Sequence, residues 1–104
     1  MYYVYVLLSL KDYKFYIGFT EDIKKRLADH NAGRNTSTKS RRPFELIYYE
    51  AHLSKEDALR REAYFKTTKG KSTLKQMLRA ALDNKIITTQ PWRSGEQRFT
   101  KDYR

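Results

Sequence analysis

The sequence contains no cysteine among its 104 residues, and no run of about 18 apolar residues, the minimum length of a membrane-spanning helix. Without cysteine the chain has neither a disulfide framework nor a thiolate zinc site, so any metal must be held mainly by oxygen ligands or by His30 or His52. Oxygen ligands favour a hard cation such as magnesium. Residues 1–4 also lack the basic region and cleavage site of a signal peptide. We therefore expect a cytoplasmic protein without a membrane partner.

Acidic residues are few relative to basic ones, with 12 Asp and Glu against 22 Lys and Arg, and the net charge is +10. Such an excess is the electrostatic pattern of a protein that binds a phosphate backbone. With 104 residues, of which 39% are hydrophobic, the chain is long enough for one modest core and too short for two. We expect one folded domain over residues 1–83, followed by an irregular tail over residues 84–104 in which no periodicity is evident.

The spacing of β-branched, aromatic and apolar residues predicts three strands and three helices. Residues 2–8 and 15–19 flank a polar turn and predict a hairpin. Thr20 is expected to cap the first helix and Gly33 to end it, and Gly70 is expected to break the helical pattern before the third helix. The order of these elements predicts an α/β fold, with a small, mainly antiparallel three-stranded sheet flanked by helices. The third strand is expected over residues 46–52, and the helices over residues 21–32, 55–67 and 72–82.

Side-chain alternation along the first two strands brings two tyrosines together. Tyr5 lies on the face opposite Val4 and Val6, and Tyr16 lies on the face opposite Ile17. Matching the apolar faces across a four-residue loop predicts that Tyr5 pairs directly with Tyr16. By itself this pattern is also that of a packed cross-strand aromatic pair.

Three ionisable residues occupy helix positions where apolar residues are expected. Arg26 and His30 share one helical stripe with Ile23 and Leu27, and Glu62 lies on the apolar face of the second predicted helix. With the tyrosines, these groups could supply the proton acceptor, the cation and the leaving-group assistance that phosphodiester hydrolysis needs. Taken singly, Arg26 and Glu62 could instead form a structural ion pair, and His30 could be a hydrogen-bonded structural residue.

The segments Tyr3-Val4-Tyr5 and Tyr16-Ile17-Gly18, followed by Arg26, His30 and Glu62, resemble the GIY-YIG nuclease superfamily, and its small single-domain bacterial members in particular. The resemblance implies that residues 1–83 form a GIY-YIG-like nuclease domain. It also implies that Glu62 binds Mg²⁺ or Mn²⁺ and that Arg26 contacts the scissile phosphate. Tyr5 or Tyr16 would activate or position the water, and His30 would assist in proton transfer or phosphate contact.

The chain departs from the family pattern at three places. Tyr3 replaces the first glycine of the family name, and Phe19 follows Gly18 where some members carry a lysine. Many members have an asparagine late in the domain, and the third predicted helix contains none at a matching place. The phosphate contact of the missing lysine is expected from the basic stretch of residues 34–42, by Lys39, Arg41 or Arg42.

The resemblance and the charge together predict a metal-dependent endonuclease, with DNA favoured over RNA as its substrate. A different class explains the charge equally well, namely a non-catalytic nucleic-acid-binding module that retains the nuclease fold. Glu62 distinguishes the two classes, because a carboxylate repels phosphate unless a metal bridges them. A homodimer or a protein partner is a further expectation for so small a nuclease domain.

Overall fold

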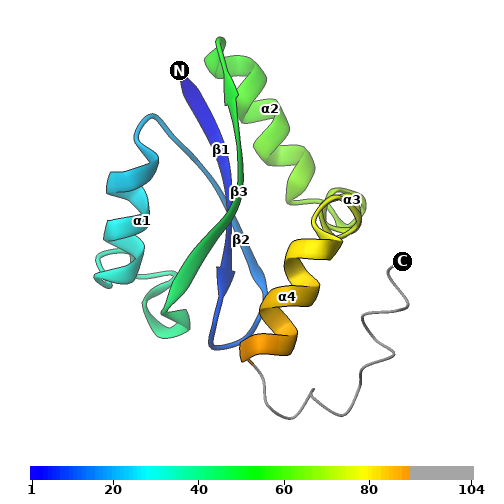
Figure 1. Ribbon diagram of the computed structural model, residues 1–104. Helices are drawn as coiled ribbons and strands as arrows, with labels where there is room; N and C mark the ends of the chain where they lie inside the picture. The colour runs from blue at the N-terminus through cyan, green and yellow to red at the C-terminus, as the bar shows by residue number, and fades with distance from the viewer. Residues whose placement is uncertain (90–104) are drawn as a thin grey trace.

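The computed structural model describes residues 1–89, and the side chains of residues 1–84. Three strands form one sheet, with α1 against one face and the other α-helices on the opposite side (Figure 1). No helix in the described part of the chain is both long and apolar enough to cross a membrane. In chain order the elements are β1 (Tyr2–Ser9), β2 (Phe15–Thr20), α1 (Ile23–Asn31), η1 (Lys39–Arg41), β3 (Phe44–His52), α2 (Lys55–Phe65), α3 (Thr68–Met77) and α4 (Arg79–Thr89).

The sheet has the strand order β2-β1-β3, and both pairings are antiparallel, which confirms the predicted fold class. The predicted register of the hairpin is wrong by two residues, because Tyr5 pairs with Gly18 and Tyr16 pairs with Leu7. β1 continues through Ser9, so the four-residue loop begins one position later than expected. A shift of two preserves side-chain parity, and the rings of Tyr5 and Tyr16 still lie on the same face with centroids 6.3 Å apart.

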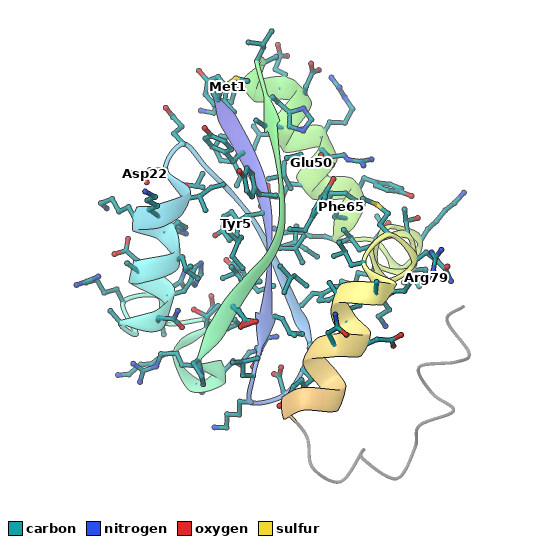
Figure 2. The ribbon with its side chains drawn as sticks, in the orientation of Figure 1. Met1, Tyr5, Asp22, Glu50, Phe65 and Arg79 are labelled. Atoms are coloured by element: carbon teal, nitrogen blue, oxygen red, sulfur yellow. The ribbon has the colours of Figure 1, made fainter. Side chains whose placement is uncertain are left out.

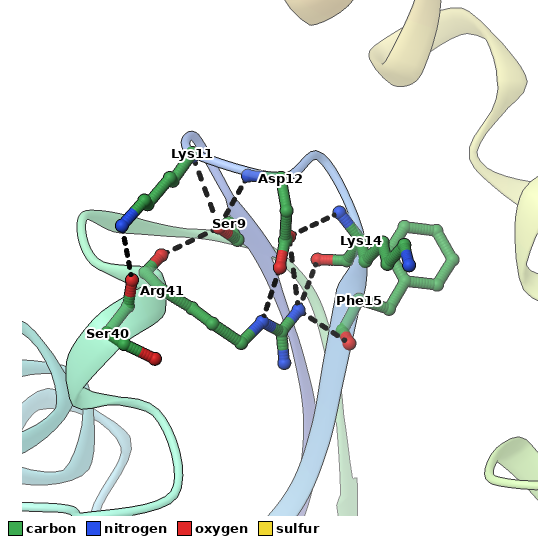
Figure 3. A network of polar contacts seen from close by, with 7 residues as sticks. All are labelled: Ser9, Lys11, Asp12, Lys14, Phe15, Ser40 and Arg41. Atoms are coloured by element: carbon green, nitrogen blue, oxygen red, sulfur yellow. Dashed lines mark hydrogen bonds and ion pairs between the residues drawn. The ribbon is translucent and has the colours of Figure 1, made fainter.

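The hairpin loop is organised by Ser9, which is fully buried. Its hydroxyl accepts from the backbone amides of Lys11 and Asp12, both at 3.1 Å, and donates to the carbonyl of Arg41 at 2.6 Å (Figure 3). Tyr13 closes the loop in the left-handed region, with φ of 57°. These contacts explain why the strand extends to Ser9 before the chain turns.

Two apolar clusters lie on the two faces of the sheet. The α2 side packs Val4, Val6 and Ile17 against residues of α2 and α3, whereas the α1 side packs Tyr5 and Leu7 with partly buried neighbours. Figure 2 shows Tyr5 on the α1 side of the sheet and Phe65 on the α2 side. The second cluster therefore holds the tyrosine pair between the sheet and α1.

The first helix begins two residues later than predicted. Asp22, rather than Thr20, is its N-cap, and the Asp22 carboxylate accepts from the amide of Lys25 at 3.1 Å. Thr20 instead accepts from the amide of Asp22 at 3.0 Å, and so shapes the turn before the helix. Gly33 follows the C-cap with φ of 77°, as expected for a glycine that ends a helix.

The third predicted helix is two helices that meet at Leu78. α3 begins at Thr68, so Gly70 lies inside the helix. A side chain at this position would not fit, because its Cβ would overlap the backbone carbonyl of Tyr64. The glycine permits the close approach of α3 to α2 and does not break the helix. The predicted irregular tail is wrong for its first residues, because α4 continues through residues 84–89. The remainder of the predicted tail, including Trp92, lies outside the described residues.

A polar network joins β3 to α2 on the side of the sheet away from α1. The Glu50 carboxylate accepts hydrogen bonds from the Tyr48 hydroxyl at 2.8 Å and from Arg61 Nε at 2.9 Å, and it lies 3.0 Å from His52 Nε2. The Arg61 guanidinium also lies 4.3 Å from the centroid of the Phe65 ring. Burial opposes ionisation of Glu50, but the hydrogen bonds from Arg61, Tyr48 and His52 outweigh it and lower the pKa of the carboxyl.

Candidate active site

Tyr5 lies at the centre of the candidate site, on the middle strand of the sheet, and is 2% exposed. Its cross-strand partner is Gly18, and a Cβ at that position would overlap the Tyr5 hydroxyl. The glycine of the Tyr-Ile-Gly motif therefore makes room for the tyrosine of the first motif. The two motifs form one structural unit in which a side chain from β1 lies over bare backbone of β2.

A chain of hydrogen bonds runs inward from α1 through the Tyr5 hydroxyl. Arg26 Nε donates to that hydroxyl at 3.3 Å, and the same oxygen lies 3.0 Å from His30 Nε2. On the far side of the imidazole, Nδ1 lies 2.8 Å from the Thr38 hydroxyl. That hydroxyl donates to the backbone carbonyl of Asn35 at 3.3 Å. His30 and Thr38 are both fully buried, so the inner part of the chain is shielded from water.

One arrangement of the protons gives every group in this chain a donor or an acceptor. Thr38 has a single hydroxyl proton; when the Asn35 carbonyl accepts it, the hydroxyl accepts in turn from His30 Nδ1–H. Nε2 of the neutral ring is then an acceptor, and the Tyr5 hydroxyl donates a hydrogen bond to it. Burial, and next the charge of Arg26, lower the pKa of His30, which keeps the ring neutral near pH 7.

Tyr5 is a protonated group at neutral pH. Burial raises its pKa to about 12, against the lowering effect of the hydrogen bond from Arg26. Within this net shift, electrostatic interactions with Tyr16 and Glu62 raise the pKa and the charge of Arg26 lowers it, so the Glu62 carboxylate acts electrostatically on the Tyr5 hydroxyl. Tyr5 alone is therefore a weak base, and its hydroxyl proton is directed at His30.

Tyr16 is a half-buried neighbour on the edge strand β2. Its ring packs edge-on against the His30 ring, with centroids 4.8 Å apart, and against Phe44 at 6.5 Å. These contacts hold the imidazole in place from the side. Both tyrosines of the predicted pair therefore contact the His30 ring. The sequence predicts only that His30 lies on an inward helical stripe.

Glu62 comes from α2, on the other side of the sheet from α1 (Figure 1). Its side chain is 18% exposed, and it forms an ion pair of 3.1 Å with Lys66 one turn further along the helix. The structural ion pair between Arg26 and Glu62 that the sequence allowed is absent among the described residues, since Arg26 donates to Tyr5 instead.

A shallow concavity of about 450 Å³ opens beside Arg26. The rest of its lining comes from α1 and the loop after it, where Arg34 pairs with Asp29 at 2.8 Å. The loop contributes the short polar side chains of Asn35, Thr36 and Ser37. A phosphate group next to Arg26 would meet hydroxyl and amide groups here in place of apolar surface.

The three predicted phosphate contacts of the basic stretch have different surroundings. Lys39 and Arg42 are exposed, and Arg42 Nε donates to the Lys39 carbonyl at 2.9 Å. Arg41 is held by the hairpin loop, because its Nε lies 2.7 Å from Asp12 Oδ2 (Figure 3). Its Nη2 also donates to the Lys14 carbonyl at 3.1 Å. The guanidinium of Arg41 therefore joins η1 to the hairpin.

Thr38 and Asn35 are site residues that the sequence did not reveal. They lie in a loop without periodic signal, and their role depends on a ring eight residues before Thr38. No group of three or more His, Asp or Glu side chains with metal-binding geometry occurs in the described part of the chain. Glu62 is the one predicted ligand, and a half-buried carboxylate suits a magnesium ion that keeps its waters and binds substrate phosphates.

Comparison with known proteins shows the family of the chain. A model of the GIY-YIG catalytic domain matches residues 1–76. A UPF0213 protein of Lactiplantibacillus plantarum is 44% identical over 88 residues, which cover 82% of this chain and 84% of that protein. A UPF0213 protein of Streptococcus pyogenes is 49% identical over 71 residues, covering 67% and 76%. The solution NMR structure of a UPF0213 protein from Bacillus halodurans is 37% identical, covers 71% of this chain and 82% of that one, and has a TM-score of 0.45. This chain is a member of the GIY-YIG catalytic domain family, and so of the nuclease superfamily that carries this domain.

Proposed function

We propose that this protein is a divalent-metal-dependent endonuclease that hydrolyses phosphodiester bonds, with DNA favoured over RNA. The observation that supports the proposal is the directed chain from Arg26 through Tyr5 to His30. The chain connects a cation, a hydroxyl and a neutral base by hydrogen bonds. If Tyr5 and Tyr16 were only a packed aromatic pair, the fold would not need a buried base beside them.

Tyr5 and His30 together act as the general base. A tyrosine hydroxyl has two lone pairs, of which Arg26 Nε–H occupies one, so the other can accept a proton from the attacking water. As that proton arrives, the Tyr5 hydroxyl proton moves to His30 Nε2 along the hydrogen bond of 3.0 Å. The buried ring is thus the final acceptor, and the phenolate, disfavoured at a pKa of about 12, does not accumulate.

Arg26 supplies the positive charge for the phosphate. In the described part of the chain its Nη groups make no hydrogen bond, so the outer edge of the guanidinium is available to phosphate oxygens. The Nε contact to Tyr5 fixes the direction of this edge. A phosphate held there lies close to the hydroxyl that handles the water.

Glu62 is the residue that would hold the metal. When bound, a divalent ion would neutralise charge on the phosphate and on the leaving oxygen. A single carboxylate is enough for magnesium, which takes its remaining ligands from water and substrate phosphates. To bind the ion, Glu62 must release Lys66. The release costs little, because Lys66 is 56% exposed and an ion pair with so exposed a lysine contributes little to stability.

The same ion pair supports a second candidate function. Because Lys66 already neutralises Glu62, the carboxylate does not require a metal, as in a nucleic-acid-binding module that has lost turnover. The two candidates differ in a single assay. The nuclease cuts only with Mg²⁺ or Mn²⁺, whereas the binding module retains nucleic acid equally well with or without the ion and never cuts it.

The test is cleavage of duplex, single-stranded and branched DNA and of RNA, with magnesium, with manganese and with chelator. We expect metal-dependent cleavage that is lost in Glu62→Gln. Glu56→Gln is the matched control, because Glu56 is an exposed acid in the first turn of the same helix. Equal activity of the Glu62→Gln and Glu56→Gln variants, or no cleavage of any substrate by the wild type, contradicts the proposal.

A further inference from the structure

A basic groove lies at the hairpin end of the molecule, away from the candidate active site. It has a volume of about 600 Å³ and is formed by the hairpin loop, by η1 and by α3. Six of its lining residues carry the argument, namely Asp12, Lys14, Phe15, Arg41, Lys71 and Lys75.

The acidic group of the groove is neutralised within the fold. The hydrogen bonds that Asp12 accepts, led by that from Arg41, outweigh the effect of burial and lower the pKa of the carboxyl, so it stays ionised and paired with that guanidinium. The ammonium groups of Lys14, Lys71 and Lys75 form no ion pair among the described residues. The groove therefore presents three uncompensated positive charges.

The arrangement of these charges is unfavourable without an anion. Lys71 and Lys75 are one turn apart on α3, where like charges cost about 0.2–0.5 kcal/mol, and Lys14 approaches the same groove from the loop between β1 and β2. A polyanion in the groove would turn this repulsion into attraction. Surface lysines that serve solubility alone do not need to converge from two separate elements.

The floor of the groove is fixed before any ligand binds. Arg41 donates to the carbonyls of Lys14 at 3.1 Å and Phe15 at 3.3 Å, besides its two contacts with Asp12. Figure 3 shows the Lys14 side chain extending beside the Phe15 ring, on the side away from Arg41. The hairpin backbone thus holds the lysine and an aromatic ring together, a combination suited to backbone phosphates and nucleotide bases.

Lys14, at the mouth of the groove, directly precedes the edge strand β2, which also carries Gly18 of the candidate site. Lys14 precedes Gly18 by four residues, and at about 3.3 Å per residue this is about 13 Å. One strand of a duplex rises about 3.4 Å per nucleotide, so 13 Å corresponds to about four nucleotides. A nucleic acid that follows the edge strand β2, with its scissile phosphate beside Tyr5 and Arg26, would therefore pass Lys14 about four nucleotides from the cut.

We infer that Lys14, Lys71 and Lys75 form a second nucleic-acid-binding site, which binds backbone phosphates beyond the cut and begins at Lys14, about four nucleotides from the bond to be cut. The inference rests on the proposed function for the kind of ligand and for its path across β2. In this arrangement α3 and the hairpin bind the nucleic acid, whereas Arg26 and Glu62 take part in the reaction.

The test measures DNA binding by fluorescence anisotropy at several salt concentrations, with chelator present so that no cleavage occurs. Lys71→Ala/Lys75→Ala is compared with Lys24→Ala/Lys55→Ala, which removes the same charge from exposed lysines outside the groove. Removing two phosphate contacts should make the negative slope of log K against log salt about 1.8 shallower and weaken duplex binding at 0.1 M salt by about 10-fold to 60-fold. The control should change the slope by less than about 0.5.

Equal losses in the two variants would mean that only net charge matters, and would overturn the inference, as would no loss in the groove variant. Lys71→Arg/Lys75→Arg should restore binding, and urea unfolding should show that all variants are folded. Anionic lipid vesicles are a separate arm, and groove-dependent binding to vesicles but not to DNA also overturns the inference. DNA binding without any cleavage contradicts the proposed function alone.

If the wild type cuts, trimming the substrate to two nucleotides beyond the cut on the groove side should abolish the difference between wild type and groove variant.

Discussion

Replacing Thr38 by valine removes one hydroxyl from the inner end of the hydrogen-bond chain and nearly preserves the shape of the side chain. The substitution leaves Nδ1–H of the buried His30 ring without its acceptor, which costs about 1–3 kcal/mol. The ring avoids this cost when its proton moves to Nε2, where it donates to the Tyr5 oxygen and no longer accepts from it. An energy of that size is a factor of about 5–150 in the tautomer population, so we expect kcat to fall by up to that factor.

Two measurements separate this effect from a loss of packing. Nitrogen chemical shifts of His30 report which ring nitrogen carries the proton, and urea unfolding reports the stability of the variant. We expect the wild type to be protonated at Nδ1, the Thr38→Val ring to shift toward protonation at Nε2, and Thr38→Ser to restore both the tautomer and kcat. A wild-type ring protonated at Nε2, or unchanged kcat in Thr38→Val, would refute the assigned direction of the chain.

Three further predictions follow from the same structure. Cleavage should decline as the pH falls through the pKa of His30, because only the neutral ring accepts a proton. Burial and Arg26 lower that pKa, so the midpoint should lie below the ordinary value of about 6.5. A cleavage rate that rises on acidification contradicts this prediction. Gly18→Ala should destabilise the fold by about 1–3 kcal/mol in urea unfolding, because its Cβ overlaps the Tyr5 hydroxyl; an unchanged midpoint would show that the strands separate without cost. Glu50→Gln should reduce the free energy of unfolding at pH 7 by about 1–3 kcal/mol. The pKa of Glu50 is lowered in the folded state, so its contribution is present above about pH 4.5 and is lost as the pH falls through the folded pKa; a difference that stays constant down to pH 3 would exclude it.

Local rules predict which side chains of the candidate site lie together. Strand parity put Tyr5 and Tyr16 on one face, and this survived a register error because the error was an even number of residues. Helical periodicity put Arg26 and His30 inward on α1, where both meet the Tyr5 hydroxyl. Both rules depend only on short-range geometry, which the sequence expresses directly.

The features that the sequence did not reveal depend on distant partners. Ser9 extends β1 because its hydroxyl bonds a carbonyl 32 residues away, and Gly70 belongs inside a helix because that helix packs on Tyr64. The guanidinium of Arg41 pairs with Asp12, 29 residues earlier, a contact that the sequence does not indicate. Thr38 is buried by a loop whose course no periodicity describes. Each case involves a contact that exists only after the fold has formed.

The most direct test of the catalytic chain is the cleavage rate of Tyr5→Phe beside that of the wild type, with magnesium or manganese present. The substitution removes only the hydroxyl that joins Arg26 to His30 and leaves the ring over Gly18. The account predicts metal-dependent cleavage by the wild type and a loss of about 10²–10⁴-fold in Tyr5→Phe, the usual contribution of a general base, in a variant that remains folded. A Tyr5→Phe variant that cuts as fast as the wild type would contradict it.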